Sequence, residues 1–140
     1  MTPENPIERV VLQTLKLTWP FYAVGALYVV GPVLAWILGA LAVLVLYLGP
    51  AVRADMRATG PVPVIIWVWI AGMALMLVAL WVGHMDWDLG LKKTIKSSIG
   101  WAKGWALIAL FPLIGAVLPI RREVLVRGQC IIGLWTLILA

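Results

Sequence analysis

An uncharged run of 36 residues, Leu17 to Val52, is the feature that most limits how this chain can fold. As one helix it would be about 54 Å long, whereas the hydrocarbon core of a bilayer is about 30 Å thick. The run must therefore be divided. Gly31-Pro32 is the predicted break, because proline donates no backbone hydrogen bond and disfavours helix in the residue before it. We predict a helical hairpin that turns there, with a single kinked, tilted helix as the alternative.

The composition is typical of a membrane protein with several spans. Of the 140 residues, 64% are hydrophobic and 12% are charged, and the mean hydropathy is +1.04. A soluble domain carries about 25% charged residues. The net charge of +5 does not indicate nucleic-acid binding, since the basic residues lie in short connections between apolar runs. A single cysteine, Cys130, excludes an intrachain disulfide and a cysteine metal cluster.

Three more apolar runs predict further membrane helices. Val64 to Gly83 is an uncharged span with tryptophans near its ends, and Ile99 to Ile120 is a span that contains two prolines. Gln129 to Ala140 would make only about 18 Å of helix, which is too short to cross a bilayer. The predicted fold is an all-α polytopic transmembrane helical bundle with four to five hydrophobic spans and short interfacial amphipathic helices. We expect residues 1–140 to form a single transmembrane domain, the N-terminal part of a longer membrane protein.

The N-terminal segment and the distribution of charge predict how the chain is oriented. Thr2 to Pro6 is typical of a helix start, and the residues are acidic and Pro-rich rather than a cleavable signal. The apolar spacing from Ile7 to Leu15 predicts either a short interfacial helix or the polar first turns of span one. With the hairpin, one side holds seven basic residues and the other holds four. The positive-inside rule then places the N-terminus in the cytoplasm and His84 to Trp105 outside. With a kinked helix the counts are six and five, which decide nothing.

The polar stretch His84 to Trp105 contains the best candidate for a functional site. On a helix, three of its lysines fall within about 40° of one another: Lys92, Lys96 and Lys103. The opposite side holds residues that suit a membrane boundary: Thr94, Ser98, Trp101 and Trp105. The lysine stripe covers about 16 Å, which suits an anionic headgroup or a lipid-linked diphosphate. The alternative is ordinary interfacial anchoring without a specific ligand.

Other residues that carry chemistry give weaker signals. His84 stands beside Asp86 and Asp88, where it could bind a cation or move a proton, but such a histidine is more often a solvated residue at a helix end. Met73 and Met76 are typical of packing or lipid-facing residues rather than metal ligands. The sequence has no Gly-rich phosphate loop, no H-E-x-x-H pattern and no nucleophile elbow. We therefore assign no catalytic residue, no metal ligand and no cofactor.

Most of the chain resembles the front half of bacterial O-antigen ligase/polymerase-type membrane proteins. The similar segments are GALYVVGPVLAWILGALAVLVLY (Gly25 to Tyr47), WVGHMDWDLG (Trp81 to Gly90), and the stretch that begins KSSIGWAKGW and ends GLWTLIL (Lys96 to Leu139). The resemblance implies a polytopic inner-membrane enzyme. Such enzymes take a glycan from undecaprenyl diphosphate at the periplasmic face. They transfer it to lipid A–core oligosaccharide or to another growing chain, in lipopolysaccharide or surface polysaccharide assembly.

The same resemblance implies where the catalytic residues of the family lie. The family is understood as metal-independent, with essential His and Arg residues on a large periplasmic loop in its second half. No catalytic residue therefore carries over to this chain. The implied partners are membrane lipids, the lipid-linked glycan donor and the glycan acceptor, without nucleic acid. The alternatives are a non-catalytic helical membrane scaffold or small subunit, and a small transporter component.

Overall fold

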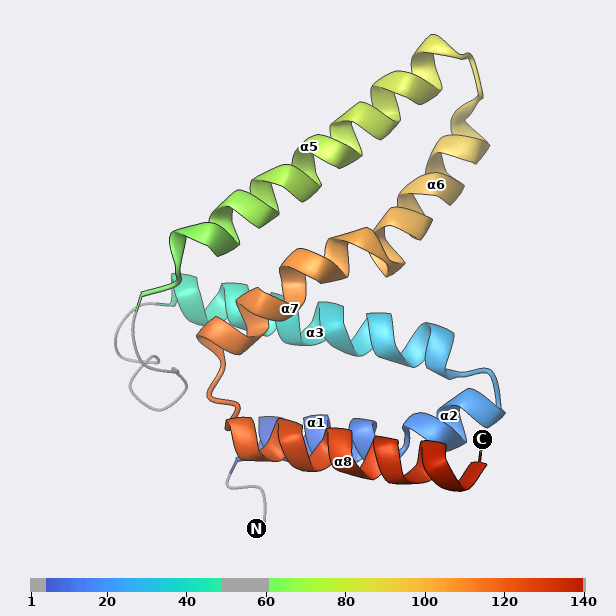
Figure 1. Cartoon of the computed structure of the whole chain (residues 1–140). Coiled ribbons are helices and arrows are strands. Elements are labelled where there is room, and N and C mark those ends of the chain that lie inside the picture. The colour runs from blue at the N-terminus through green and yellow to red at the C-terminus, as the bar shows by residue number, and fades with distance from the viewer. Residues whose placement is uncertain (1–4, 49–60, 140) are drawn as a thin grey trace.

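The computed structural model describes residues 5–48 and 61–139, and every regular element within those ranges is a helix. The elements, labelled in Figure 1, are α1 (Pro6–Lys16), α2 (Thr18–Ala23), α3 (Leu27–Tyr47), α5 (Val64–Asp86), α6 (Leu91–Lys103), α7 (Trp105–Val117) and α8 (Arg122–Leu139). The predicted all-α helical bundle is confirmed. The sequence also predicts a polar connection with Arg53, Asp55 and Arg57 ahead of the span that begins at Val64, and these three residues lie outside the described ranges.

The helices form two stacked layers and a projecting hairpin (Figure 1). α1, α2 and α8 make the lower layer, and α3 and α7 lie above it. α5 and α6 pack against each other and extend upward from α7. Because α7 contacts both α3 and α5, it joins the hairpin to the rest of the molecule.

Three helical stretches are long and apolar enough to cross a membrane: Leu27–Tyr47, Val64–Asp86 and Leu91–Val117. The chain is therefore a membrane protein, with fewer spans in the described residues than the four to five predicted. One reason is that the N-terminal run is split into the short helices α1 and α2. The other is that the apolar run from Gln129 is the second half of α8, whose first two turns are charged. Continuation of the chain beyond this run stays a prediction.

The predicted turn at Gly31-Pro32 is wrong, because both residues lie inside α3. The chain instead reverses at Gly25, whose φ of 71° lies in the left-handed region that glycine favours. Gly25 N donates to Tyr22 O at 2.9 Å, which closes the end of α2. Pro32 removes only the intrahelical hydrogen bond to the carbonyl of Tyr28, near the start of α3. The chain therefore reverses within the predicted run and is not one kinked helix (Figure 1), but the reversal lies before the predicted position, and the segment ahead of it is two short helices rather than a span.

α1 begins at the predicted helix start and forms a helix of its own. Asn5 caps it, since Asn5 Oδ1 accepts a hydrogen bond from Glu8 N at 2.8 Å, and Pro6 fills the first position. The helix ends at Lys16, and α2 follows as a separate short helix. Leu12 is buried, and α1 packs along α8. α1 is therefore a short amphipathic helix rather than the polar first turns of a continuous span.

α6 and α7 form one stretch with a bend at Gly104. The backbone of Gly104 leaves the helical range, with φ −121° and ψ −81°, although Gly104 N still donates to Gly100 O at 3.1 Å. The predicted span Ile99 to Ile120 therefore begins inside α6, crosses this bend and ends just beyond α7. Pro112 lies inside α7, which continues past it to Val117.

The centre of the fold is the close approach of α3 and α7. Gly39 lies directly against Leu110, so that a Cβ at position 39 would overlap the leucine side chain. Small residues let two membrane helices come close enough for dispersion contacts to accumulate. The buried cluster around this contact includes Ala35, Ala42, Val45, Leu113, Ile114, Val117 and Leu118. By contrast, the large apolar side chains of α5 are mostly exposed, as expected where a helix faces lipid.

Replacing Gly39→Leu should separate α3 from α7. Overpacking of a filled core costs about 1–3 kcal/mol, and Leu110 is itself buried and cannot move aside freely. The matched control is Gly72→Leu in α5, where an added Cβ meets nothing within 4 Å. Thermal unfolding of the detergent-solubilised protein should show a lower melting temperature for Gly39→Leu only. Equal melting temperatures for the two variants would contradict a tight α3–α7 contact.

Candidate functional site

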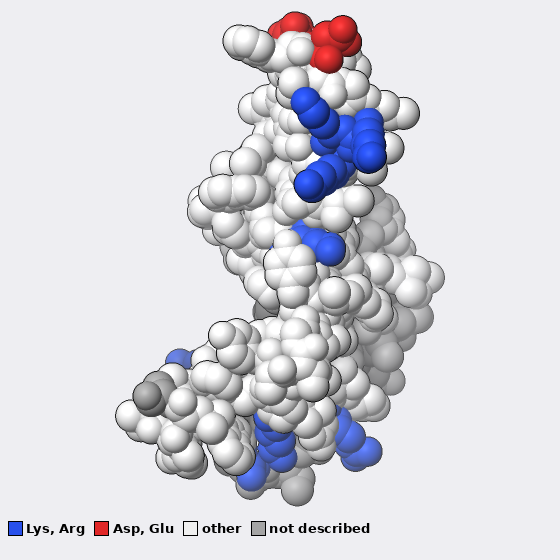
Figure 2. All heavy atoms as spheres, turned by 90° about the vertical axis from the view of Figure 1, so that its right-hand side faces the viewer, with Lys and Arg blue, Asp and Glu red and all other residues white. Residues whose placement is uncertain are grey.

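The predicted lysines lie on α6, where the structure divides them into two groups. Lys92, Lys93 and Lys96 are exposed near the start of the helix, and we call these three residues the lysine face. Figure 2 shows basic side chains gathered in this part of the molecule, below the acidic side chains at the top. Lys103 is half-buried at the other end of α6. Two of the three predicted residues are therefore brought together, with Lys93 added to them.

Lys103 is held by an aromatic ring from another helix. Its Nζ lies 5.1 Å from the ring centroid of Tyr28 in α3, which is the geometry of a cation–π contact. Nearby, Trp36 Nε1 donates to Ala102 O at 3.0 Å, which is a second link between α3 and the end of α6. Lys103 therefore ties α6 to α3 in addition to any role toward a ligand.

The position of the lysine face is not explained by helix stability. α6 begins after Gly90, which has a φ of 79°, and no side chain caps its first amides. The start of a helix carries partial positive charge, so the cations of Lys92 and Lys93 are unfavourable in its first turn. An anion placed there would be attracted by the lysines and by the uncapped amides together. Lys92 and Lys93 thus lie where a bound anion would offset the unfavourable interaction of their charges with the helix dipole.

The side of α6 that faces α5 uses its polar groups for helix packing. Ser98 Oγ accepts a hydrogen bond from Trp81 Nε1 at 2.8 Å and donates one to Thr94 O at 2.8 Å. Trp105, also predicted on this side, is exposed. Trp101 is half-buried, and its Nε1 has no hydrogen-bond partner among the described residues. Ser98 therefore lies on the side of α6 that faces α5 and bonds to protein rather than facing a membrane boundary, and Trp105 begins α7 beyond the bend at Gly104.

His84 is a packing residue rather than a solvated loop residue. It lies in the last turn of α5, half-buried, with Nδ1 2.8 Å from Leu80 O and Nε2 3.0 Å from Ser97 Oγ. A carbonyl only accepts hydrogen bonds, so Nδ1 carries the proton, and in the neutral ring Nε2 accepts from the Ser97 hydroxyl. Asp86 and Asp88 remain exposed. Within the described ranges, no three His, Cys, Asp or Glu side chains lie close enough to hold a metal ion.

A cavity of about 600 Å³ lies between α5 and α6, beside the lysine face. Its walls are mainly apolar and include Trp81, Leu91, Ile95 and Ile99. The lysines themselves are outside this lining. Lys92 precedes Ile95 by three residues and Lys96 precedes Ile99 by three, so each lysine is a helix-surface neighbour of a cavity-lining isoleucine, and the cationic surface borders the cavity along that edge. This arrangement suits a ligand with a hydrocarbon part and an anionic part.

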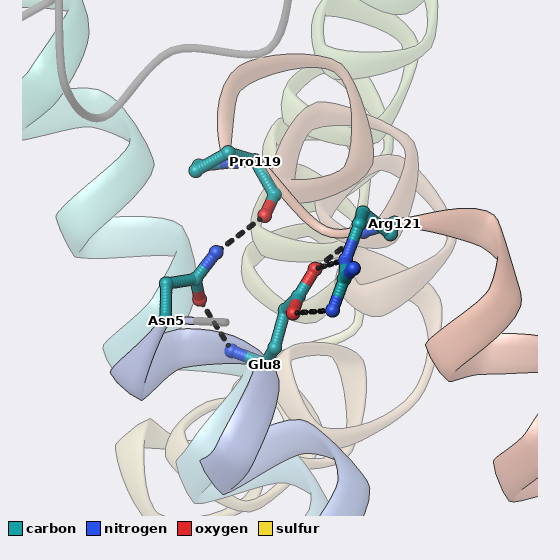
Figure 3. Close-up of polar contacts among 4 residues, drawn as sticks. All are labelled: Asn5, Glu8, Pro119 and Arg121. Carbon is teal, nitrogen blue, oxygen red and sulfur yellow. Dashed lines mark hydrogen bonds and ion pairs between the residues drawn. The ribbon is translucent and has the colours of Figure 1, made fainter. Parts of the chain in front are cut away.

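A second polar cluster, which the sequence interpretation did not find, lies at the opposite end of the molecule (Figure 3). Glu8 in α1 is fully buried and pairs with Arg121, which is 32% exposed. Arg121 donates three hydrogen bonds to the carboxylate, from its backbone N at 3.0 Å, from Nε at 2.8 Å and from the terminal Nη2 at 2.9 Å. Asn5 Nδ2 donates to Pro119 O at 2.9 Å beside it. Both carboxylate oxygens are occupied, so this cluster holds the chain together rather than binding a ligand.

One signal in the sequence could have indicated the buried carboxylate. Glu8 shares a helix face with Leu12 and Leu15, at the spacing i, i+4 and i+7 of a buried stripe. An acid on the apolar face of a membrane-associated helix requires a partner. The partner itself was not predictable, because Arg121 is 113 residues away and is one of several basic residues near the last connection.

Replacing Glu8→Gln should destabilise the protein by about 3 kcal/mol, because the half-buried Arg121 charge loses its partner. The matched control is Glu123→Gln, which neutralises an exposed acid in α8 and should change stability by less than about 0.5 kcal/mol. Denaturant unfolding in detergent, followed by circular dichroism, measures both. Equal stabilities of the two variants would show that the pair contributes nothing specific.

No family model significantly matches this chain, and searches of curated proteins and of solved structures found no significant match either.

Proposed function

We propose that this chain is the N-terminal membrane portion of an O-antigen ligase- or polymerase-like glycan transferase. In this proposal the lysine face receives the diphosphate of an undecaprenyl-linked glycan at the periplasmic face of the bacterial inner membrane. The observation that carries it is the juxtaposition of three exposed lysines, an uncapped helix start and an apolar cavity. The sequence resemblance supplies the substrate class.

The two parts of the ligand fit the two parts of the site. The diphosphate is attracted by Lys92, Lys93 and Lys96, each of which contributes about 1 kcal/mol near a charged lipid surface. The isoprenoid chain finds an apolar surface between α5 and α6, next to Ile95 and Ile99. Lysine suits this role because its ammonium is a flexible point charge that binds a phosphate without fixed geometry. The glycan acceptor and the transfer step are left to other parts of the transferase.

The arrangement of the ends supports a cytoplasmic N-terminus. The contacts of Asn5 and Glu8 with Pro119 and Arg121 bring the start of α1 to the α7–α8 connection. The α5–α6 turn lies at the far end of the molecule from both (Figure 1). With the count of seven basic residues against four that the hairpin gives, the positive-inside rule would make this end cytoplasmic and put the lysine face outside.

A non-catalytic membrane scaffold is the second candidate. It is favoured by the polar contacts of α5 and α6, since Trp81, His84 and Ser98 all bond within or between these helices. A scaffold with interfacial lysines would not discriminate between anionic lipids of equal charge. The lipid-binding experiment below therefore separates the two candidates.

Changing Lys92, Lys93 and Lys96 together to Gln should weaken binding of undecaprenyl diphosphate in phosphatidylcholine vesicles by tenfold to about a hundredfold, from about 1 kcal/mol per lysine. Lys103→Gln should have a smaller effect, because Tyr28 already engages its ammonium. The control combines Arg9→Gln with Lys16→Gln on α1, and it should leave binding unchanged.

Fluorescence titration at fixed ionic strength compares vesicles that carry undecaprenyl diphosphate with vesicles that carry phosphatidylglycerol at equal total charge. A preference for the diphosphate supports the transferase, and equal binding supports the scaffold. Loss of binding confined to the α6 variants, with normal expression, supports the proposal. Unchanged binding in the triple variant assigns these lysines to membrane anchoring, and the glycan transferase proposal then loses the observation that carries it.

A further inference from the structure

A second cavity lies between the lower layer and the helices above it, away from the lysine face. It has a volume of about 580 Å³, within the range of about 300–1,000 Å³ that is usual for small-molecule sites. α1 and α8 form one side, and α3 and α7 form the other. Leu34, Leu38, Phe111 and Ile114 make its walls largely apolar. Such a space at the side of a membrane protein is suited to a hydrocarbon chain.

Two glycines on the upper side of this cavity leave space open without serving helix packing. Gly31 in α3 and Gly115 in α7 line it, and an added Cβ at either would meet nothing within 4 Å. Gly39 differs, because it lies against Leu110 and permits a close helix contact. A glycine inside a helix costs about 0.5–1 kcal/mol relative to alanine. At positions 31 and 115 closer helix packing does not explain the loss of helix stability, because the space beside each glycine is open.

The cavity has a polar side formed by α8. Arg122 and Gln129 line it, seven residues apart and so on one face of the helix. Within residues 5–48 and 61–139, the structure shows no ion pair or hydrogen bond for either side chain. The neighbouring Arg121 differs, because Glu8 neutralises it. The acidic Glu123 follows Arg122 but does not line the cavity.

We infer that this cavity binds one anionic phospholipid, with an acyl chain between the two layers and the headgroup phosphate at Arg122 and Gln129. The apolar walls match the hydrocarbon chain, and the guanidinium matches the net negative headgroup, since arginine binds phosphate with two parallel hydrogen bonds. Basic pockets between membrane helices are a recurring type of lipid site. The site lies at the opposite end from the lysine face and does not depend on the proposed glycan transferase activity.

The test uses the full chain purified in detergent with equal amounts of phosphatidylglycerol and phosphatidylcholine, and native mass spectrometry counts the bound lipid. The wild-type protein should retain one phosphatidylglycerol with about fivefold preference over phosphatidylcholine, the effect of one favourable charge near a lipid surface. Arg122→Gln should abolish this preference. Arg9→Gln, which removes an exposed charge outside the cavity lining and outside the lysine face, should leave it unchanged.

Filling the cavity gives an independent readout. Gly115→Leu and Gly31→Leu each place a side chain in the open space, and each should remove the bound lipid while the helical circular dichroism spectrum is retained. Gly72→Leu, outside the cavity, should keep the lipid. The inference is overturned if phosphatidylglycerol and phosphatidylcholine are retained equally, or if a folded Gly115→Leu or Gly31→Leu variant keeps its lipid. Should both glycine variants unfold, the lipid preference of Arg122→Gln decides alone.

Discussion

The buried pairing of Glu8 with Arg121 determines how the first and last helices of the described chain align. A fully buried carboxylate cannot remain without a partner, because the cost of removing its charge from water is far larger than the stability of a small protein. Arg121 meets both of its oxygens. From this contact α1 and α8 continue side by side in the same direction. The contacts keep one offset of 113 residues: Glu8 with Arg121, Leu15 with Gly128, and Trp19 with Ile132.

This fixed register has consequences for the rest of the fold. It places the start of α1 at the end of α7, so that the lower layer lies under α3 and α7 (Figure 1). The same register turns the face of Arg122 and Gln129 toward the cavity between the layers. A buried ion pair is weak evidence for stability, but it is a strong means of selecting one alignment of two helices. The lower layer is therefore specified by charge and the α3–α7 contact by shape.

Hydropathy predicted the helical class and the position of α5 well, because both depend on local composition. The position of the turn was not predictable from proline alone. Proline weakens a helix by removing one backbone hydrogen bond, but packing in a membrane bundle can tolerate that loss, so the helix continues through Pro32 and the chain turns at Gly25. The candidate site shows the same division. Helical periodicity correctly placed Lys92 and Lys96 on one exposed face. It also grouped Lys103 with them, since the pattern within one helix contains no information about the contact with Tyr28 on another helix. Information about partners far apart in the sequence was absent in each case.

Arg121 and the lysine face differ in whether the protein supplies a partner for the positive charge. Arg121 has a dedicated acid, and its guanidinium makes fixed, paired hydrogen bonds. The lysine face has three exposed cations with flexible stems at a helix start that no side chain caps. An anion bound there would meet ammonium groups that can rearrange around it. A surface of this kind is suited to ligands that bind and leave, whereas a satisfied buried pair is suited to permanent structure.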